Sequence, residues 1–240
     1  MSAPAGAPEP VPDLAGSVVL GALGEDAQHL HPMLRRRFGV STAAGYSCVG
    51  RGTMDRVWHG PAWTLPFLHL GAWRNILVPD SATDVPFSVE NYAYRDSLGR
   101  ETVTVVRTFE VRPGRRRRFD ATLVADGPGR VLDYLGTHQH LAVDLRPSVL
   151  PDGSLRIVSG AQRFYEGPVA FRFPMALSGT AVLTEGWDAE RERFTIAVAV
   201  SNARFGPLAG YSGSFTCEFP AVVGDAVPPA VRPLREEARR

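Results

Sequence analysis

The sequence contains no lysine, and all 26 of its basic residues are arginine. A guanidinium group keeps its proton at ordinary pH, so mechanisms that need a neutral amine, such as Schiff-base formation, are excluded. Asp and Glu together number 25, which leaves a formal net charge of +1. General binding to nucleic acid is therefore not expected, because it needs a basic surface that displaces counterions.

Cysteine and long apolar runs are also scarce. Cys48 and Cys217 are too few for a disulfide framework, and neither belongs to a CxxC or Cys/His zinc pattern. We expect two small buried side chains, with a single disulfide as the alternative. No apolar run approaches the roughly 18 residues of a membrane span, and no signal-peptide pattern opens the chain. These absences predict a cytoplasmic protein.

Turn residues and alternating strands are abundant. The 240 residues include 24 glycines and 20 prolines, which fits a chain with many turns. After a first strand at 45–59, alternating apolar and polar residues are typical of antiparallel strands. About ten strands are too many for one flat sheet, so we expect an antiparallel β-barrel or a strongly curved sheet. The later predicted strands are 86–95, 100–111, 115–125, 129–135, 139–149, 154–164, 177–187, 192–202 and 211–219.

We place this barrel-like domain at residues 14–220 of a mainly β (α+β) chain, with one segment before it, one after it, and short helices at its start. Residues 1–13 are rich in alanine and proline and predict a disordered leader. Apolar spacing between residues 14 and 38 predicts two short helices, the second beginning at Pro32. Residues 221–240 are rich in proline and predict a flexible tail.

The segment 58–73, after the first strand, is aromatic and almost uncharged. Trp63, Phe67 and Leu70 recur at helical spacing. The segment can be a helix packed across one end of the sheet, a cover over a ligand cavity, or a surface that rests on lipid, where tryptophan is favoured. Under the second interpretation Trp63 and Trp73 are candidate ligand contacts.

His138 and His140 are the close histidine pair that we predict in a strand. Residues two apart project to the same face of a strand, and Asp144 shares that parity. The HxHxxxD spacing resembles the first half of a cupin metal motif, but no later histidine completes it, and we assign no metal ligand. An enzyme would use either imidazole for proton transfer, with Asp144 to orient it. An ordinary polar face is the plainer alternative.

Two arginines interrupt the apolar positions of their predicted strands. Arg107 shares parity with neighbouring valines, and Arg163 with leucine, isoleucine and alanine. An inward guanidinium needs a partner, and Glu90, flanked by Tyr92, is a plausible one. The arginines would hold a carboxylate or phosphate of a bound molecule, or form structural ion pairs. The candidate ligand-binding residues are Arg107, Arg163, Glu90, Tyr92, Gln162, Trp63 and Trp73.

Several blocks are distinctive. They are Leu30–Pro32, Gly60–Trp63, Glu90–Asp96, Asp133–His140 and Ser159–Pro168. Together they resemble a family of uncharacterised bacterial proteins, domain of unknown function 4166, over roughly residues 20–219. The resemblance implies one domain that occurs alone in actinobacteria, or attached to a nicotinamide-dependent oxidoreductase or to membrane-spanning partners. It implies no catalytic residue and no cofactor, so the cofactor stays unknown. The lysine-free composition also suits a high-GC genome.

Our leading hypothesis is a barrel that binds a small, largely apolar molecule with an acidic or polar head. One alternative is an enzyme that uses the histidine pair. Another is a peripheral protein that seats residues 61–76 on a membrane surface. The three predict different structures: a closed cavity, a histidine in a cleft beside a carboxylate, or joint exposure of the aromatic side chains.

Overall fold

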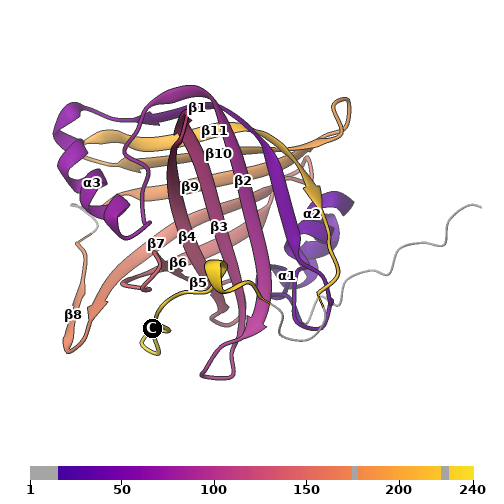
Figure 1. Ribbon diagram of the computed structural model, residues 1–240. Coiled ribbons are helices and arrows are strands. Elements are labelled where there is room, and N and C mark those ends of the chain that lie inside the picture. The colour runs from indigo at the N-terminus through magenta and orange to yellow at the C-terminus, as the bar shows by residue number, and fades with distance from the viewer. Residues whose placement is uncertain (1–15, 175–177, 223–226) are drawn as a thin grey trace, which may run out of the picture.

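In the computed structural model, which describes residues 16–174, 178–222 and 227–240, ten antiparallel strands close into a barrel (Figure 1). The strands are β1 (Cys48–His59), β2 (Ala82–Arg95), β3 (Glu101–Arg112), β4 (Arg115–Ala125), β5 (Val131–Leu135), β6 (Leu141–Val149), β7 (Leu155–Glu166), β8 (Val169–Arg172), β9 (Thr180–Asp188), β10 (Arg193–Asn202) and β11 (Gly206–Glu218). Around the barrel the order is β6-β5-β4-β3-β2-β1-β11-β10-β9-β7, and β7 pairs with β6 to close the ring. The remaining strand, β8, pairs with β7 in a hairpin.

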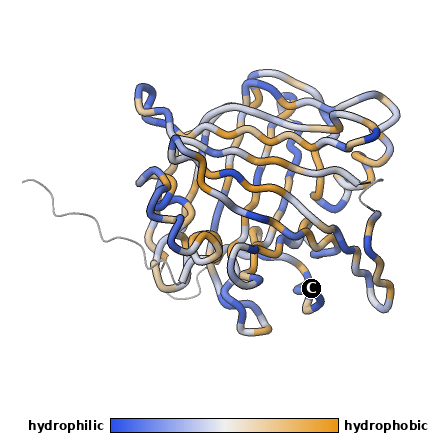
Figure 2. Tube along the Cα trace, turned by 180° about the vertical axis from the view of Figure 1, so that it is seen from behind, coloured by the Kyte–Doolittle hydropathy of each residue, from blue (hydrophilic) through white to orange (hydrophobic). Residues whose placement is uncertain are grey.

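Alternation along each strand sends every second side chain into the barrel. On β2, Val85, Phe87 and Val89 are buried in the main hydrophobic core. Phe87 lies opposite Phe109 of β3, with ring centroids 5.1 Å apart, and Tyr211 of β11 lies 5.1 Å from Phe109. In Figure 2 most of the hydrophobic colour follows the strands, whereas several connecting turns are hydrophilic.

Two short helices, α1 (Val18–Leu23) and α2 (Pro32–Phe38), cover one end of the barrel, which we call the plugged end (Figure 1). The hydroxyl of Ser17 accepts a hydrogen bond from the Leu20 N–H and caps α1. Pro32 begins α2, where its missing N–H costs nothing. A 3₁₀ turn, Gly24–His29, joins the two. The apolar side chains of α1 belong to the same core as the strands, so the helices close the barrel by burying that core.

The opposite end, which we call the α3 end, carries α3 (Leu65–Trp73) in the connection from β1 to β2. A 3₁₀ turn, Ala62–Thr64, precedes it. The five-residue β5 pairs only with the second half of β4 and leaves the first half without that neighbour. The backbone of Asn75 takes this place, since the Asp120 N–H donates to its carbonyl at 2.8 Å. Val78 then enters the barrel core, so the segment after α3 completes the wall.

The last described segment, 227–240, lies against the outer wall of the barrel and begins with the 3₁₀ turn Pro229–Val231. Val231 packs with Tyr94 and Val106. The hydroxyls of Tyr134 and Tyr165 donate to backbone oxygens of the last two residues, each at 2.9 Å. The composition of this proline-rich segment predicts a flexible tail. Composition cannot show the two tyrosines whose hydroxyls bind the segment. The expected leader at 1–13 lies outside the described residues.

The predicted fold class, a mainly β antiparallel barrel with short N-terminal helices and an aromatic helical segment after the first strand, is confirmed. The predicted strands match the observed ones to within a few residues at most of their ends. The short β8 was missed because its four residues are all exposed and show no alternation. No helix within the described residues is both long enough and apolar enough to span a bilayer.

Candidate functional site

A cavity of about 110 Å³ lies inside the barrel beneath the plugged end. Most of its wall is aliphatic, from side chains on β3, β4, β6, β7, β9 and β10, and α1 and α2 add Val19 and Phe38. A smaller set of polar groups shares the lining: Arg37, Asn91, Arg107, Asp133, Ser159, Glu185 and Tyr211. An apolar pocket with a few convergent polar groups is the usual form of a small-molecule site.

Arg107 enters the cavity from the middle of β3, as its parity predicts. Its guanidinium carbon lies over the ring of Phe119 on β4, 4.9 Å from the centroid. Arg107 is half-buried and forms no ion pair among the described residues, so its cation–π contact offsets only part of the cost of partly removing a cation from water. The buried Tyr211 hydroxyl, which also faces the cavity, has no hydrogen-bond partner in the described part of the chain. Burial raises the Tyr211 pKa, and Arg107 opposes that rise.

Asp133 faces the same cavity from β5. It lies between Leu123 of β4 and Val143 of β6 in the register, and its Oδ1 has no hydrogen-bond partner within the described residues. Burial raises the pKa of Asp133 to about 7, against the opposing effect of Arg107. Both protonation states are therefore populated near neutral pH. The carboxyl group can donate or accept a hydrogen bond there.

Arg37 of α2 closes the cavity at the plugged end. It forms an ion pair with Glu185 of β9, and its Nη1 donates to the Asn91 Oδ1 at 3.1 Å. Both thiols lie near the same Nη1, Cys48 at 3.3 Å and Cys217 at 4.0 Å, and both are free. A hydrogen bond with Cys217 and the nearby Arg37 lower the pKa of Cys48 to about 7 despite its burial.

Sequence reasoning missed Asp133, Glu185, Tyr211 and Arg37. The signal for the first two was available. Asp133 shares parity with Val131 and Leu135, and Glu185 shares parity with Ala181 and Leu183, just as Arg107 does with its valines. Arg37 was assigned to a helix C-terminus only, and nothing in the sequence shows that α2 turns it into the barrel.

The other predicted ligand contacts do not line the cavity. Glu90 and Tyr92 alternate with inward residues of β2 and lie on the outer face, where Tyr92 packs beside Tyr94. The pairing of strands β6 and β7 shifts register between Val143 and Leu145. This bulge reverses the parity of β7.

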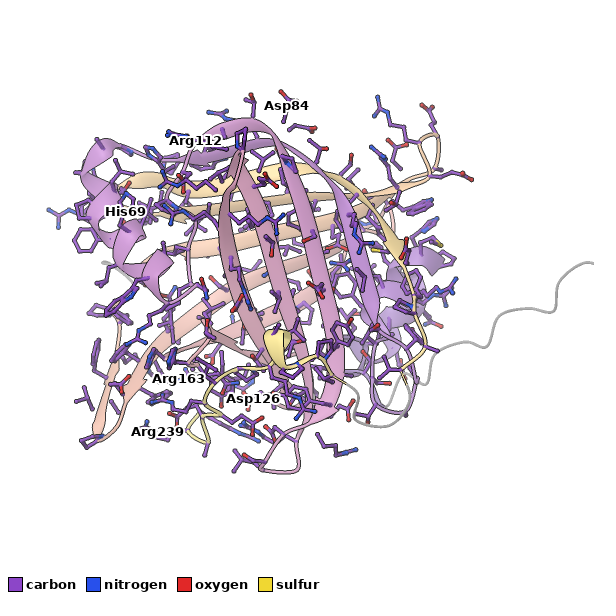
Figure 3. All side chains as sticks on the ribbon, in the orientation of Figure 1. His69, Asp84, Arg112, Asp126, Arg163 and Arg239 are labelled. Atoms are coloured by element: carbon purple, nitrogen blue, oxygen red, sulfur yellow. The ribbon has the colours of Figure 1, made fainter. Side chains whose placement is uncertain are left out.

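Because of the bulge, Arg163 pairs with Ala142 on the outer face, and its Nη1 lies 3.3 Å from the Asp144 Oδ2. Arg163 lies in the same region as the C-terminal segment (Figure 3). Gln162 donates to the Gly179 carbonyl at 2.6 Å. Trp63 and Trp73 are exposed at the α3 end, remote from the cavity lining.

The histidine pair lies in the turn before β6 rather than in the strand. Gln139, between the two, has a positive φ of 54°, and the imidazole rings stack with centroids 5.3 Å apart. His140 is buried, and its Nδ1 lies 2.7 Å from the Glu166 carboxylate. Asp144 was expected to orient a histidine but pairs with Arg163 instead. Partial burial and the nearby Arg74 lower the pKa of His138.

No group of three or more His, Cys, Asp or Glu side chains within the described ranges is arranged to hold a metal ion. In the histidine turn, the single carboxylate at Glu166 also lies 3.9 Å from Arg235. The two imidazoles and one carboxylate can relay a proton, since His140 and Glu166 are within hydrogen-bond distance.

Comparison with known proteins identifies a relative and a family for the chain. A curated relative, the uncharacterized protein YndH of Bacillus subtilis (strain 168), is 31% identical over 187 residues, which cover 78% of this chain and 90% of the relative. The occurrence in actinobacteria that the resemblance implies stays a prediction, since this relative comes from Bacillus subtilis. The family model described as Domain of unknown function (DUF4166) matches residues 30–215, which include every strand except the last few residues of β11, and the chain belongs to this family.

Proposed function

We propose that the barrel binds a small, largely apolar molecule with an acidic head in the cavity beneath α1 and α2. The observation that carries this proposal is Arg107, a half-buried cation that faces a largely aliphatic cavity and forms no ion pair with any described carboxylate. A buried charge is costly unless it is paired. A ligand carboxylate would supply the missing pair, and the fork of the guanidinium suits two oxygens.

The neighbouring groups favour the same head. Within the described residues, the Tyr211 hydroxyl and the Oδ1 of protonated Asp133 have no hydrogen-bond partner and can donate. A carboxylate on the ligand would accept from both, whereas an amine would meet the like charge of Arg107. The acidic head also matches the sequence hypothesis, although of its three proposed anchors only Arg107 lies in the cavity.

The cavity sets the size of the ligand. An engineered apolar cavity of about 150 Å³ holds benzene, and the present cavity is about 110 Å³. A single ring or a short chain of roughly six to eight heavy atoms therefore fits. A long acyl chain would require the aromatic layer of Phe87, Phe109 and Tyr211 to move apart.

Calorimetric titration with cyclopentanecarboxylate and hexanoate, which have eight heavy atoms each, against their matching alcohols tests the proposal. We expect the acids to bind, the alcohols to bind at least about tenfold more weakly, and Arg107→Met to abolish the difference. Arg146→Met is the matched control, since Arg146 is exposed on β6. Native mass spectrometry of protein from its own cells should show a small bound acid. Equal affinity for acid and alcohol, or no binding of either, would contradict the proposal.

The contact between His140 and Glu166 supports a second candidate, an enzyme that uses His138 or His140 for proton transfer. Glu166 takes the orienting role first expected of Asp144. A screen of chromogenic esters and phosphates with the wild type and His140→Gln tests it. Activity that the variant loses while its unfolding temperature is unchanged would support the enzyme, and no turnover in the screen would leave the binding function favoured.

The free thiols of Cys48 and Cys217 support the proposed cytoplasmic location.

A further inference from the structure

The α3 end of the barrel carries an apolar surface that the cavity does not explain. Trp63, Phe67, Leu70 and Trp73 are 49, 70, 66 and 75% exposed. Within α3, which Figure 3 shows at one side of the barrel, only His69 is polar, and it is exposed like its apolar neighbours. A helix on the surface of a globular protein normally carries polar residues on the face away from the core. Here the outward face is as apolar as the inward one.

Two neighbouring segments extend this surface. Phe205, in the turn between β10 and β11, contacts Trp63 with ring centroids 5.1 Å apart. The β7–β8 hairpin projects from the same end, because β7 begins at the plugged end and finishes beyond the ring, and Figure 1 shows α3 and β8 on the same side. Its Val169 and Phe171 are also exposed. We call the following set the apolar rim: Trp63, Phe67, Leu70, Trp73, Val169 and Phe171.

Arginines accompany the aromatic residues of this end. The guanidinium of Arg74 lies 4.7 Å from the Trp73 ring centroid, and that of Arg204 lies 5.6 Å from the Phe205 centroid. Arg172 follows Phe171 directly. In the part of the chain that the structure describes, none of these three arginines forms an ion pair.

The carboxylates of this end are mostly engaged. Asp80 pairs with two arginines of β4, Glu110 pairs with Arg116, and Glu166 contacts His140. No acidic residue occurs between Asp55 and Asp80. An apolar surface bordered by unpaired cations is thus left at the α3 end.

We propose that the apolar rim seats the α3 end of the barrel on an anionic lipid bilayer. Tryptophan and phenylalanine side chains enter the interfacial region of a bilayer, and arginines beside them reach the headgroup phosphates. The rim lies on projecting elements, a helix and a hairpin, rather than in a groove. A bilayer accommodates projecting side chains without matching their shape, whereas a partner protein must supply complementary pockets. This inference does not depend on what occupies the cavity.

Cosedimentation of the full chain with two kinds of vesicle tests the proposal. One kind contains phosphatidylcholine alone, and the other contains about one third phosphatidylglycerol. The wild type should bind the anionic vesicles more tightly, and its tryptophan emission should shift to shorter wavelength. Phe67→Ser with Leu70→Ser should weaken binding about tenfold or more, because two exposed apolar side chains are lost. Arg74→Gln with Arg204→Gln should weaken binding about tenfold to anionic vesicles only.

Leu98→Ser is the matched control, since Leu98 is 50% exposed in the turn between β2 and β3 at the plugged end. It should bind like the wild type. The proposal is overturned if the wild type sediments with neither vesicle, or if Leu98→Ser loses as much binding as the rim variant. It is also overturned if the rim variant keeps its binding, or if that variant converts a wild-type dimer into a monomer without changing vesicle binding.

Discussion

Arg37 of α2 and Glu185 of β9 form an ion pair inside the barrel, although 148 residues separate them in the sequence. Each is almost completely buried. The ion pair joins α2 to β9. The guanidinium of Arg37 also contacts Asn91 and the thiols of Cys48 and Cys217. Removal of one partner would leave the other as an uncompensated charge in the interior.

Arg37→Met should therefore lower the free energy of unfolding by about 3 to 5 kcal/mol, as measured by urea denaturation. Adding Glu185→Leu should recover much of this loss, because the orphaned carboxylate is removed as well. The control is Arg51→Met, since the Arg51–Glu218 pair on the surface is 67% and 78% exposed and should contribute less than about 1 kcal/mol. Similar losses for Arg37→Met and Arg51→Met would mean that the buried pair has no special role.

Asp133 should make stability fall as pH rises. Its folded pKa is raised to about 7 from an ordinary 3.8, so between these values the folded state holds a proton that the unfolded state has lost. The wild type should lose about 2 to 3 kcal/mol of unfolding free energy between pH 5 and pH 8 that Asp133→Asn does not lose. Parallel stability curves for the two proteins over that range would show that Asp133 is ionised in the folded state.

Parity along the strands predicted the barrel and the inward position of Arg107, because both depend on local alternation. The same rule fails for Arg163 because of the bulge opposite Val143 and Leu145, where β7 has one extra residue and its later side chains change face. The residues of β7 that oppose Asp144 in the bulge are Gly160 and Ala161. A glycine inside a strand pattern is a signal of a bulge, and the parity rule as applied to Arg163 did not use it.

The polar lining of the cavity was only partly predictable for a different reason. Arg107 and Asp133 stand out as charges among apolar neighbours on their own strands. The Arg37–Glu185 pair arises only when α2 docks on the barrel, and the contact of His140 with Glu166 arises only when β7 returns beside the histidine turn. Such contacts depend on the tertiary arrangement, which spacing along the chain does not encode.

Glu237 should hold the C-terminal segment on the outer wall. Hydrogen bonds from Arg239 lower its pKa to about 2, and its own N–H donates to the Gln139 Oε1 at 2.6 Å. Because the folded pKa lies below the ordinary 4.5, its contribution is present above that pH and is lost as pH falls toward 2.

At neutral pH, Glu237→Gln should cost about 1 to 2 kcal/mol and speed hydrogen exchange in residues 227–240. The difference from the wild type should shrink as the solution is acidified below pH 4.5. Glu190→Gln, a change at an exposed carboxylate in the β9–β10 turn, should have no such effect. Unchanged exchange in the segment would show that the tyrosine hydrogen bonds and the apolar contacts of Val227 and Val231 hold it without the Glu237 carboxylate.

Gly136, at the end of β5, controls the junction between the α3 segment and the histidine turn. Its φ is 82°, in the left-handed region, and an added Cβ would lie 2.6 Å from the Arg74 carbonyl oxygen and 2.7 Å from the Ile76 Cγ1. Gly136→Ala must therefore strain the backbone and also push residues 74–76 away from the wall. Gly127 offers a matched control, since its φ is 86° and no atom lies within 4 Å of an added Cβ.

In both alanine variants the left-handed backbone destabilises the folded state by about 1 to 2 kcal/mol, but only Gly136→Ala also introduces a steric clash. We expect its loss of unfolding free energy to exceed that of Gly127→Ala by at least about 1 kcal/mol. Hydrogen exchange should also rise at the Thr137 N–H, which donates to the Arg74 carbonyl at 3.2 Å. Equal losses for the two variants would mean that the α3 segment adapts freely, and then it would not fix the position of the histidine pair.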